Sequence, residues 1–357
     1  MTALALPGTL ASGVSGGRTG NGSFSAGLTQ PAAPPNRREG IIMPGTYISI
    51  RHFAGMLKLS LHRKLVLIAL AALLGQPVCV QAAQLLLCGW DEVFLINTAE
   101  AAKGKIEKLW TWRAKDHEEL PPDLRGAFGT TDECKPLDGG ARVLISSSGG
   151  ACALVERPSG RVLWYAHVPN AHSLEQLPKE RIIAASSGAT NGDRLILFDI
   201  AKPDQPLWHT PMSCAHGVVW DAGRQQLWAL GSGELRSYEL KDWETDKPSL
   251  RFRASYRLPS DAGHELQAMN QGSDLVVSSA GHVYLFDRET LKFRPHPELG
   301  DKADVKCISI HPNTGRVVYL HGEEGQWWSR TLHLLGPAED IKLPGERLYK
   351  GRWLPGP

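Results

Sequence analysis

A repeat of short strand-like segments runs through most of this chain and limits its fold more than any other feature. One complete unit spans residues 214–240, where three apolar runs are separated by the turn signals at 221–223 and 231–233. Aligning on the small residues after the second run brings further units into step with a period of about 37 to 48 residues. These units begin near residues 132, 171, 263 and 305. Strand-and-turn repeats of this length are typical of β-propellers, with one four-stranded blade per repeat.

The two ends of the repeat region predict how the ring closes. The segment QLLLCGWDEVFLIN, residues 84–97, lacks a first strand, and GERLYKGRWLP, residues 345–355, reads as a first strand with nothing after it. Paired in space, the two segments complete one blade and leave no exposed sheet edges there. We therefore predict an all-β chain with a single β-propeller of six four-stranded blades, closed by the C-terminal strand. A seventh blade within residues 103–131 or 330–347 is the alternative.

The chain before the repeats differs in composition. Residues 1–55 are rich in small residues and proline over most of their length, so we interpret them as disordered or as an extension from a mis-assigned start. Residues 56–83 have a basic start, an apolar run of about eleven residues and a small-residue cleavage site, which together predict a signal peptide. The alternative is an uncleaved anchor, although the run is shorter than a membrane span. We expect a propeller domain over 84–357, periplasmic or extracellular, with no membrane attachment after cleavage.

Charge and cysteine content exclude some functions. The net charge of +2 gives no indication of nucleic-acid binding. The cysteines after the cleavage site are widely spaced and form no zinc-ligand cluster, so we interpret most as buried apolar residues and leave open one disulfide. They are Cys88, Cys134, Cys152, Cys214 and Cys307. We expect a monomer.

One basic residue recurs in each repeat at the predicted start of the first strand. Successive members are separated by 37, 44, 48, 42 and 44 residues. Because the first strands of a propeller lie innermost and run parallel, equivalent positions should form a ring at one mouth of the central channel. The predicted ligand-binding residues are Lys135, His172, His216, His264, Lys306 and Lys350.

Two kinds of ligand fit such a ring, and a structural role is the third possibility. Crowded cations should keep His172, His216 and His264 neutral, and three neutral imidazoles can hold a divalent metal with open coordination positions. Alternatively, the ring binds a carboxylate or phosphate by charge. The structural alternative is that these side chains cap strand starts. Glu265 should point away from His264 because neighbouring strand residues face opposite sides. The Ser/Gly loops at 146–150, 186–192, 231–233 and 278–281 should rim the same mouth.

Three family resemblances add to this interpretation. The segment CGWDEVFLIN, residues 88–97, with the Lys/His series, resembles an uncharacterised family of bacterial secreted six-bladed propellers. The unit ERPSGRVLWYAHV, residues 156–168, resembles repeats of quinoprotein alcohol dehydrogenases, but the chain is short for their eight blades and has no adjacent cysteines, so we expect no quinone cofactor. Propeller-fold polysaccharide lyases acting on uronates are similar in having axial histidines around a metal. That resemblance implies a metal on His172, His216 and His264.

Two functions follow. The first is a binding module, in which the ring and a Trp-rich surface hold an anionic small molecule, an acidic carbohydrate or a protein partner without turnover. Its surface tryptophans would be Trp110, Trp112, Trp327 and Trp328, whereas those at 164, 208, 220 and 228 should pack between blades. The second is a metal-dependent uronate lyase or hydrolase. Because no acid/base pair is evident in the sequence, we favour binding.

Overall fold

The computed structural model describes residues 83–269 and 272–354, all of which belong to one compact unit, Val78–Pro357. The predicted N-terminal extension lies outside the described residues, as does the predicted signal peptide except for its last residue. Among the described residues, no helix is both long and apolar enough to span a membrane.

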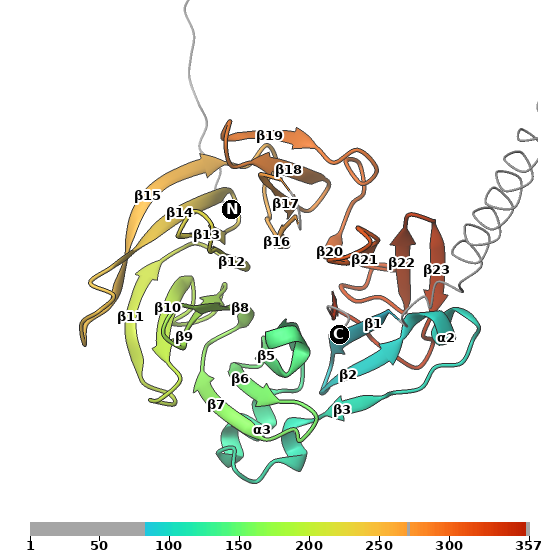
Figure 1. Cartoon of the computed structure of the whole chain (residues 1–357), viewed down its shortest axis with the longest axis horizontal. Coiled ribbons are helices and arrows are strands. Elements are labelled where there is room, and N and C mark those ends of the chain that lie inside the picture. Colours follow the sequence, from blue (N-terminus) through green and yellow to red (C-terminus); the bar gives the residue numbers. More distant parts are fainter. Residues whose placement is uncertain (1–82, 270–271, 355–357) are drawn as a thin grey trace, which may run out of the picture. The chain divides into compact units, whose positions relative to one another are not determined.

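The described residues form six antiparallel sheets of four strands arranged around a ring (Figure 1). Within each blade the strands follow one another from the innermost outward. Blade 1 contains β24 (Lys350–Trp353), β1 (Gln84–Gly89), β2 (Glu92–Asn97) and β3 (Trp110–Trp112). Blade 2 contains β4 (Thr131–Leu137), β5 (Arg142–Ser147), β6 (Ala151–Glu156) and β7 (Val162–His167). Blade 3 contains β8 (Ala171–Leu177), β9 (Arg181–Ser186), β10 (Arg194–Asp199) and β11 (Pro206–Pro211).

The second half of the ring follows the same order. Blade 4 contains β12 (Gly217–Asp221), β13 (Gln226–Leu230), β14 (Glu234–Lys241) and β15 (Ser249–Arg257). Blade 5 contains β16 (Leu266–Ala268), β17 (Asp274–Ser278), β18 (Val283–Asp287) and β19 (Lys292–Pro295). Blade 6 contains β20 (Val305–Ile310), β21 (Val317–His321), β22 (Thr331–Leu335) and β23 (Glu339–Lys342). The six-bladed prediction is therefore confirmed, and the described residues form no seventh sheet.

Strand β24 closes the ring, as predicted. It pairs with β1 in antiparallel register, with Cys88 opposite Lys350 and Leu85 opposite Trp353. On its other edge, β1 pairs with β2. The last strand of the chain is thus the innermost strand of the first blade, so both ends of the repeat region are held in one sheet.

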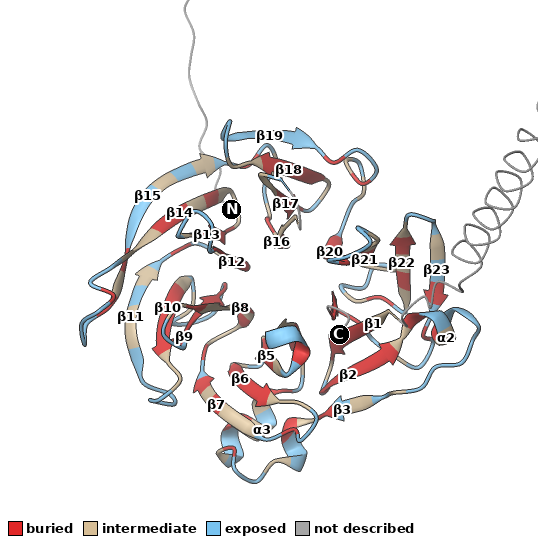
Figure 2. Ribbon diagram, viewed as in Figure 1, coloured by how far each residue is buried: buried red, intermediate tan, exposed pale blue. Residues whose placement is uncertain are grey.

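Apolar side chains fill the spaces between neighbouring blades. Each of six buried clusters joins two adjacent blades; one example contains Leu86 of blade 1 and Val143 of blade 2. The inner strands are mostly buried, whereas the outermost strands β11, β15 and β19 are largely exposed (Figure 2). Each sheet packs one face against each neighbouring blade, so the inner strands are buried on both faces and at consecutive positions.

Tryptophans follow the predicted division with one exception. Trp164 and Trp228 are buried between blades as expected. Trp112, expected on the surface, is instead 1% exposed and packs edge-on against Phe128, with ring centroids 5.3 Å apart. Trp112 is in fact the last residue of β3, on the inner side of a connection that folds back over it.

That connection between blades 1 and 2, within the segment 103–131 considered for a seventh blade, contains two short helices instead. It contains a short 3-10 helix, η1 (Ala114–Asp116), and a helix, α3 (Pro122–Ala127), which begins at a proline, a residue suited to the first helical position. The remaining short helices are α2 (Thr98–Ala102), capped by the Asn97 side chain, and η2 (Asp138–Gly140). None of them interrupts the ring.

We call the end of the ring at which the innermost strands begin the mouth. Because neighbouring strands are antiparallel, the turns that join the second and third strands of every blade lie at this same end. The Ser/Gly loops that the sequence placed at the rim are these turns. For example, Ser147 at the end of β5 pairs with Thr131 at the start of β4.

Candidate functional site

Irregularities at the starts of the innermost strands bring charged and imidazole side chains together at the mouth. The register of β4, β8 and β20 against their neighbours shifts at one residue each: Asp132, His172 and Lys306. A β-bulge of this kind leaves an extra residue unpaired and re-aims its side chain. Three of the six blades therefore present a polar residue at the mouth through the same backbone device.

The pairing defines one mouth residue per blade, and we call this set the mouth ring. His216 and His264 precede β12 and β16, and their N–H groups donate to Leu230 O and Ser278 O of the neighbouring strands. Tyr349 holds the equivalent place before β24, since its N–H donates to Cys88 O. The mouth ring consists of Asp132, His172, His216, His264, Lys306 and Tyr349.

Two of the six predicted positions therefore need correction. Lys135 lies three residues beyond Asp132, and its ammonium group donates to Glu175 Oε2 at 3.1 Å and to Val218 O at 2.9 Å. Lys350 is one residue beyond Tyr349 and is 1% exposed. The structure brings His172, His216, His264 and Lys306 together as predicted, whereas the two other lysines belong to the interior beneath them.

The three histidines form a stack across adjacent blades. The ring centroids of His172 and His216 are 4.1 Å apart with an interplanar angle of 20°, and those of His216 and His264 are 4.8 Å apart. Burial lowers the pKa of each imidazole, and the neighbouring charges lower it further: that of His216 to about 4, that of His264 to about 3, and that of His172 well below its usual value. The stack is therefore neutral at pH 7.

Backbone contacts fix which nitrogen carries the proton in two of the rings. Nδ1 of His216 lies 3.0 Å from Cys214 O, and Nδ1 of His264 lies 3.2 Å from Ala262 O. Because a carbonyl oxygen only accepts, both Nδ1 atoms carry the hydrogen and both Nε2 atoms are acceptors. Nε2 of His264 accepts from Lys306 Nζ at 3.2 Å. Nε2 of His216 has no hydrogen-bond partner within the described residues.

A cation and a carboxyl group flank the stack. Lys306 Nζ lies 3.5 Å from the carboxylate of Asp304, whose side chain is 62% exposed. On the other side, Asp132 Oδ1 lies 3.5 Å from His172 Nδ1, and burial raises the pKa of Asp132 to about 7. Nδ1 of His172 is buried without a hydrogen-bond partner. The mouth ring thus combines one ammonium group, a free imidazole acceptor on His216 and a carboxyl group whose pKa burial raises to about 7.

Beneath the ring lies a buried set of ion pairs, which we call the core network: Glu133, Glu265, Lys350 and Arg352. The Arg352 guanidinium donates to Glu133 through Nε and Nη2, both at 2.9 Å, and to Glu265 through Nη2 at 3.1 Å. Lys350 Nζ lies 3.3 Å from Glu265 and 4.0 Å from Glu133. All four side chains are at most 3% exposed.

The charges of the core network compensate one another. Burial alone would raise the pKa of Glu133, but the charges of Arg352 and Lys350 hold it below its usual range. Burial would likewise lower the pKa of Lys350, and Glu265 and Glu133 raise it instead. Two carboxylates and two cations leave no net charge, so the Lys306 ammonium above them is not neutralised from below.

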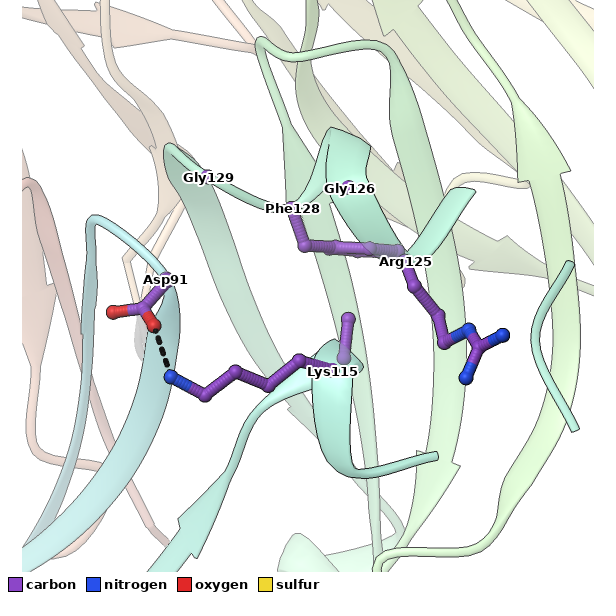
Figure 3. Close-up of a pocket in the computed structure, with 7 residues that line it drawn as sticks. Asp91, Lys115, Arg125, Gly126, Phe128 and Gly129 are labelled. Atoms are coloured by element: carbon purple, nitrogen blue, oxygen red, sulfur yellow. Dashed lines mark hydrogen bonds and ion pairs between the residues drawn. The ribbon is translucent and has the colours of Figure 1, made fainter. Parts of the chain in front are cut away.

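Neighbouring imidazole rings pack against one another, His172 stacked on His216 and His216 tilted against His264, and the described part of the chain contains no group of three His, Cys, Asp or Glu side chains that could hold a metal. A metal on the three histidines stays a prediction. Its cysteines are all free thiols. A small pocket of about 120 Å³ lies beside α3, but it includes none of the predicted site residues (Figure 3). Its lysine, Lys115, is paired with Asp91 at 3.0 Å, as the dashed line shows.

Sequence reasoning missed Asp132, Tyr349 and the acidic and arginine members of the core network. One signal was present: the first interval of the predicted series, from Lys135 to His172, is the shortest of the five, whereas starting from Asp132 gives an interval of 40 residues. In addition, a glutamate follows the mouth-ring residue in blades 2 and 5, as Glu133 and Glu265. As expected, Glu265 does not contact the histidines. The pairing of Glu265 with Arg352 could not be predicted from local sequence, because only closure of the ring brings the two residues together.

Comparison with known proteins gives a family. Of the solved structures, one that is similar is described as the crystal structure of the mitotic checkpoint complex, with 12% identity, a TM-score of 0.48, and coverage of 75% of this chain and 79% of that one. No curated protein sequence matches. The sequence profile of a family of unknown function, DUF6528, matches residues 92–356, nearly the whole propeller. This chain therefore belongs to the DUF6528 family.

Proposed function

We propose that this propeller binds an acidic sugar at the mouth ring without turning it over. The observation that carries the proposal is the combination of the Lys306 ammonium group with the neutral His216 imidazole, whose Nε2 is an acceptor without a partner within the described residues. An ammonium group pairs with a carboxylate, and a neutral acceptor nitrogen pairs with a hydroxyl donor. A ligand that carries both groups on one small skeleton is a sugar acid.

The arrangement favours binding over the metal-dependent lyase. The Nε2 of His264 is already occupied by Lys306, which leaves one fewer imidazole nitrogen for a metal ion. Proton abstraction also needs a base beside the reacting carbon. Asp132, the carboxyl group nearest to the stack, is 3% exposed and is therefore poorly placed to reach a bound sugar. A secreted location and any kinship with quinoprotein repeats are separate predictions on which this proposal does not depend.

Isothermal titration calorimetry with galacturonic acid and galactose tests the proposal. We expect galacturonic acid to bind at low salt, to bind more weakly as salt rises, and to bind better than galactose. Lys306→Met should lower the affinity for galacturonic acid about tenfold or more, because one charge-assisted hydrogen bond contributes about 1.5–3 kcal/mol. Lys342→Met, on the outermost strand of the same blade, is the matched control and should bind like the wild type.

The opposite results would remove the proposal. Equal affinity for the two sugars would show that no charge is recognised. Wild-type affinity in Lys306→Met would show that the mouth ring is not where the acid binds.

A further inference from the structure

A cluster of aromatic side chains lies at the mouth beside the ring and has no role in the site described so far. The indole rings of Trp90 and Trp327 stack with centroids 5.1 Å apart and an interplanar angle of 5°. Trp328 packs edge-on against Trp90 at 6.0 Å. We call these three residues the Trp platform. Trp327 is 41% exposed, which is unusual for so large an apolar side chain.

The platform is continuous with the mouth ring. Trp90 lies in the turn between β1 and β2, and the other two tryptophans lie in the connection between β21 and β22, both of which are mouth turns. Trp327 contacts Tyr349 with centroids 5.5 Å apart, and Tyr349 in turn lies 6.4 Å from His172. A ligand that extends out of the ring over Tyr349 therefore reaches Trp327 next.

Two glycines let the backbone come close enough to form the platform. A Cβ atom on Gly89 would lie 1.9 Å from Arg347 O, and one on Gly322 would lie 2.4 Å from Gln326 O. Only glycine allows these approaches. The first brings the segment that carries Arg347 against the end of β1, and the second folds the connection immediately before Trp327.

Two arginine side chains lie against the rings of the Trp platform. The Arg347 guanidinium lies 4.5 Å from the Trp90 ring centroid and 5.6 Å from that of Trp328, and Arg330 lies 4.8 Å from that of Trp328. Trp90 has Trp327 stacked against its ring and Arg347 beside it, so its role is to hold Trp327 in place. Trp327 is the member left accessible, in a setting with extra positive charge.

We propose that Trp327 is a second sugar subsite, which stacks on the ring next to the acidic sugar bound at the mouth ring. This inference rests on the proposed function and narrows the ligand from a monosaccharide to an acidic oligosaccharide. The flat, rigid indole offers a large contact area at low conformational cost. The nearby Arg347 and Arg330 favour a further carboxylate along the same chain.

Titrations with uronic acids of increasing length test the inference. The probes are galacturonic, glucuronic and mannuronic acids, each compared with its linear trimer. For the pair that binds best, we expect the trimer to bind at least about threefold more tightly than the monomer, since an aromatic contact contributes about 0.5–1.5 kcal/mol. Trp327→Ala should remove this gain and leave the affinity for the monomer unchanged.

Two variants make the result specific. Trp327→Phe keeps an aromatic face and should retain part of the gain. Phe252→Ala removes an aromatic residue that is 54% exposed on the outer strand of blade 4, and it should change neither affinity.

The outcomes separate the two proposals. If monomers bind through Lys306 but the trimers gain nothing, or if Trp327→Ala keeps the gain, the platform inference is overturned and the proposed function stands. If neither monomers nor trimers of any uronic acid bind, both fail. A platform that instead recognises a protein partner would give the first of these results.

Discussion

The core network lies one to three residues beyond the mouth ring in three of the six blades, yet the polar groups of the two sets are satisfied to very different degrees. In the core network every charge has a partner: Arg352 alone binds both Glu133 and Glu265. In the mouth ring the polar atoms are only partly satisfied. Within the described residues, Nδ1 of His172 has no hydrogen bond, and Nε2 of His216 has none either.

This contrast separates a structural set of charges from the proposed binding site. Buried charges that are fully paired hold a closing strand in place, because removing one leaves the others uncompensated. A neutral imidazole with an unpaired acceptor nitrogen contributes little to stability, and that nitrogen can accept a hydrogen bond from a ligand. Substitutions in the network should therefore act on stability, and those in the ring on pH response and ligand affinity.

The largest effect is expected for Arg352→Met. The substitution leaves Glu133 and Glu265 buried with only Lys350 to compensate them, so we expect the free energy of unfolding to fall by about 3–5 kcal/mol. Urea denaturation followed by circular dichroism measures this change.

Arg253→Met is the matched control. Arg253 lies on β15, the exposed outer strand of blade 4, and pairs with Glu239 on β14. It should change the free energy of unfolding by less than about 0.5 kcal/mol. A loss below about 1 kcal/mol in Arg352→Met would mean that the network does not hold the closing strand.

A smaller effect, seen only on acidification, is expected for His216→Gln. The folded-state pKa of His216 is lowered to about 4, so below pH 6.5 the unfolded chain binds a proton that the folded chain does not. Wild-type stability should fall as the pH drops from 7 to 5. The glutamine variant should lose on the order of 1–2 kcal/mol less over this interval. Urea midpoints at both pH values measure the difference.

Asp132→Asn is its control and should respond in the opposite direction. The pKa of Asp132 is raised to about 7, so the folded chain holds a proton that the unfolded chain releases above about pH 4. This contribution stabilises the wild type as the pH falls from 7. The asparagine variant should therefore lose more stability than the wild type on acidification, and equal losses in both variants would contradict the assigned protonation states.

The fold was predictable because a propeller repeats one local pattern. Each blade carries the same strand and turn signals, and the ends of the chain showed an unfinished unit at 84–97 and a spare strand at 345–355. Local signals thus sufficed for blade number and closure. They failed where a helix formed in a proline-rich connection, at Pro122–Ala127, because tertiary packing against Trp112 and Phe128 decides that segment.

The site was only partly predictable, for a reason that lies in strand register. His172, His216, His264 and Lys306 could be found because they recur at similar intervals. Lys135 was misplaced by three residues because β4 begins at Thr131, earlier than predicted, and the bulge residue Asp132 rather than a basic residue holds the ring position. The core network joins residues 219 positions apart, Glu133 and Arg352, and only closure of the ring brings them together.

For a sugar acid to bind as proposed, neutral histidines of the mouth ring must accept hydrogen bonds from its hydroxyl groups. The most direct test is the ¹⁵N NMR spectrum of imidazole-labelled protein at pH 6, with His216 assigned by comparison with His216→Gln. We predict the neutral ring with hydrogen on Nδ1, and a shift of the Nε2 resonance when galacturonic acid is added. A protonated ring at this pH, or an Nε2 resonance that does not respond to saturating galacturonic acid, would contradict the account.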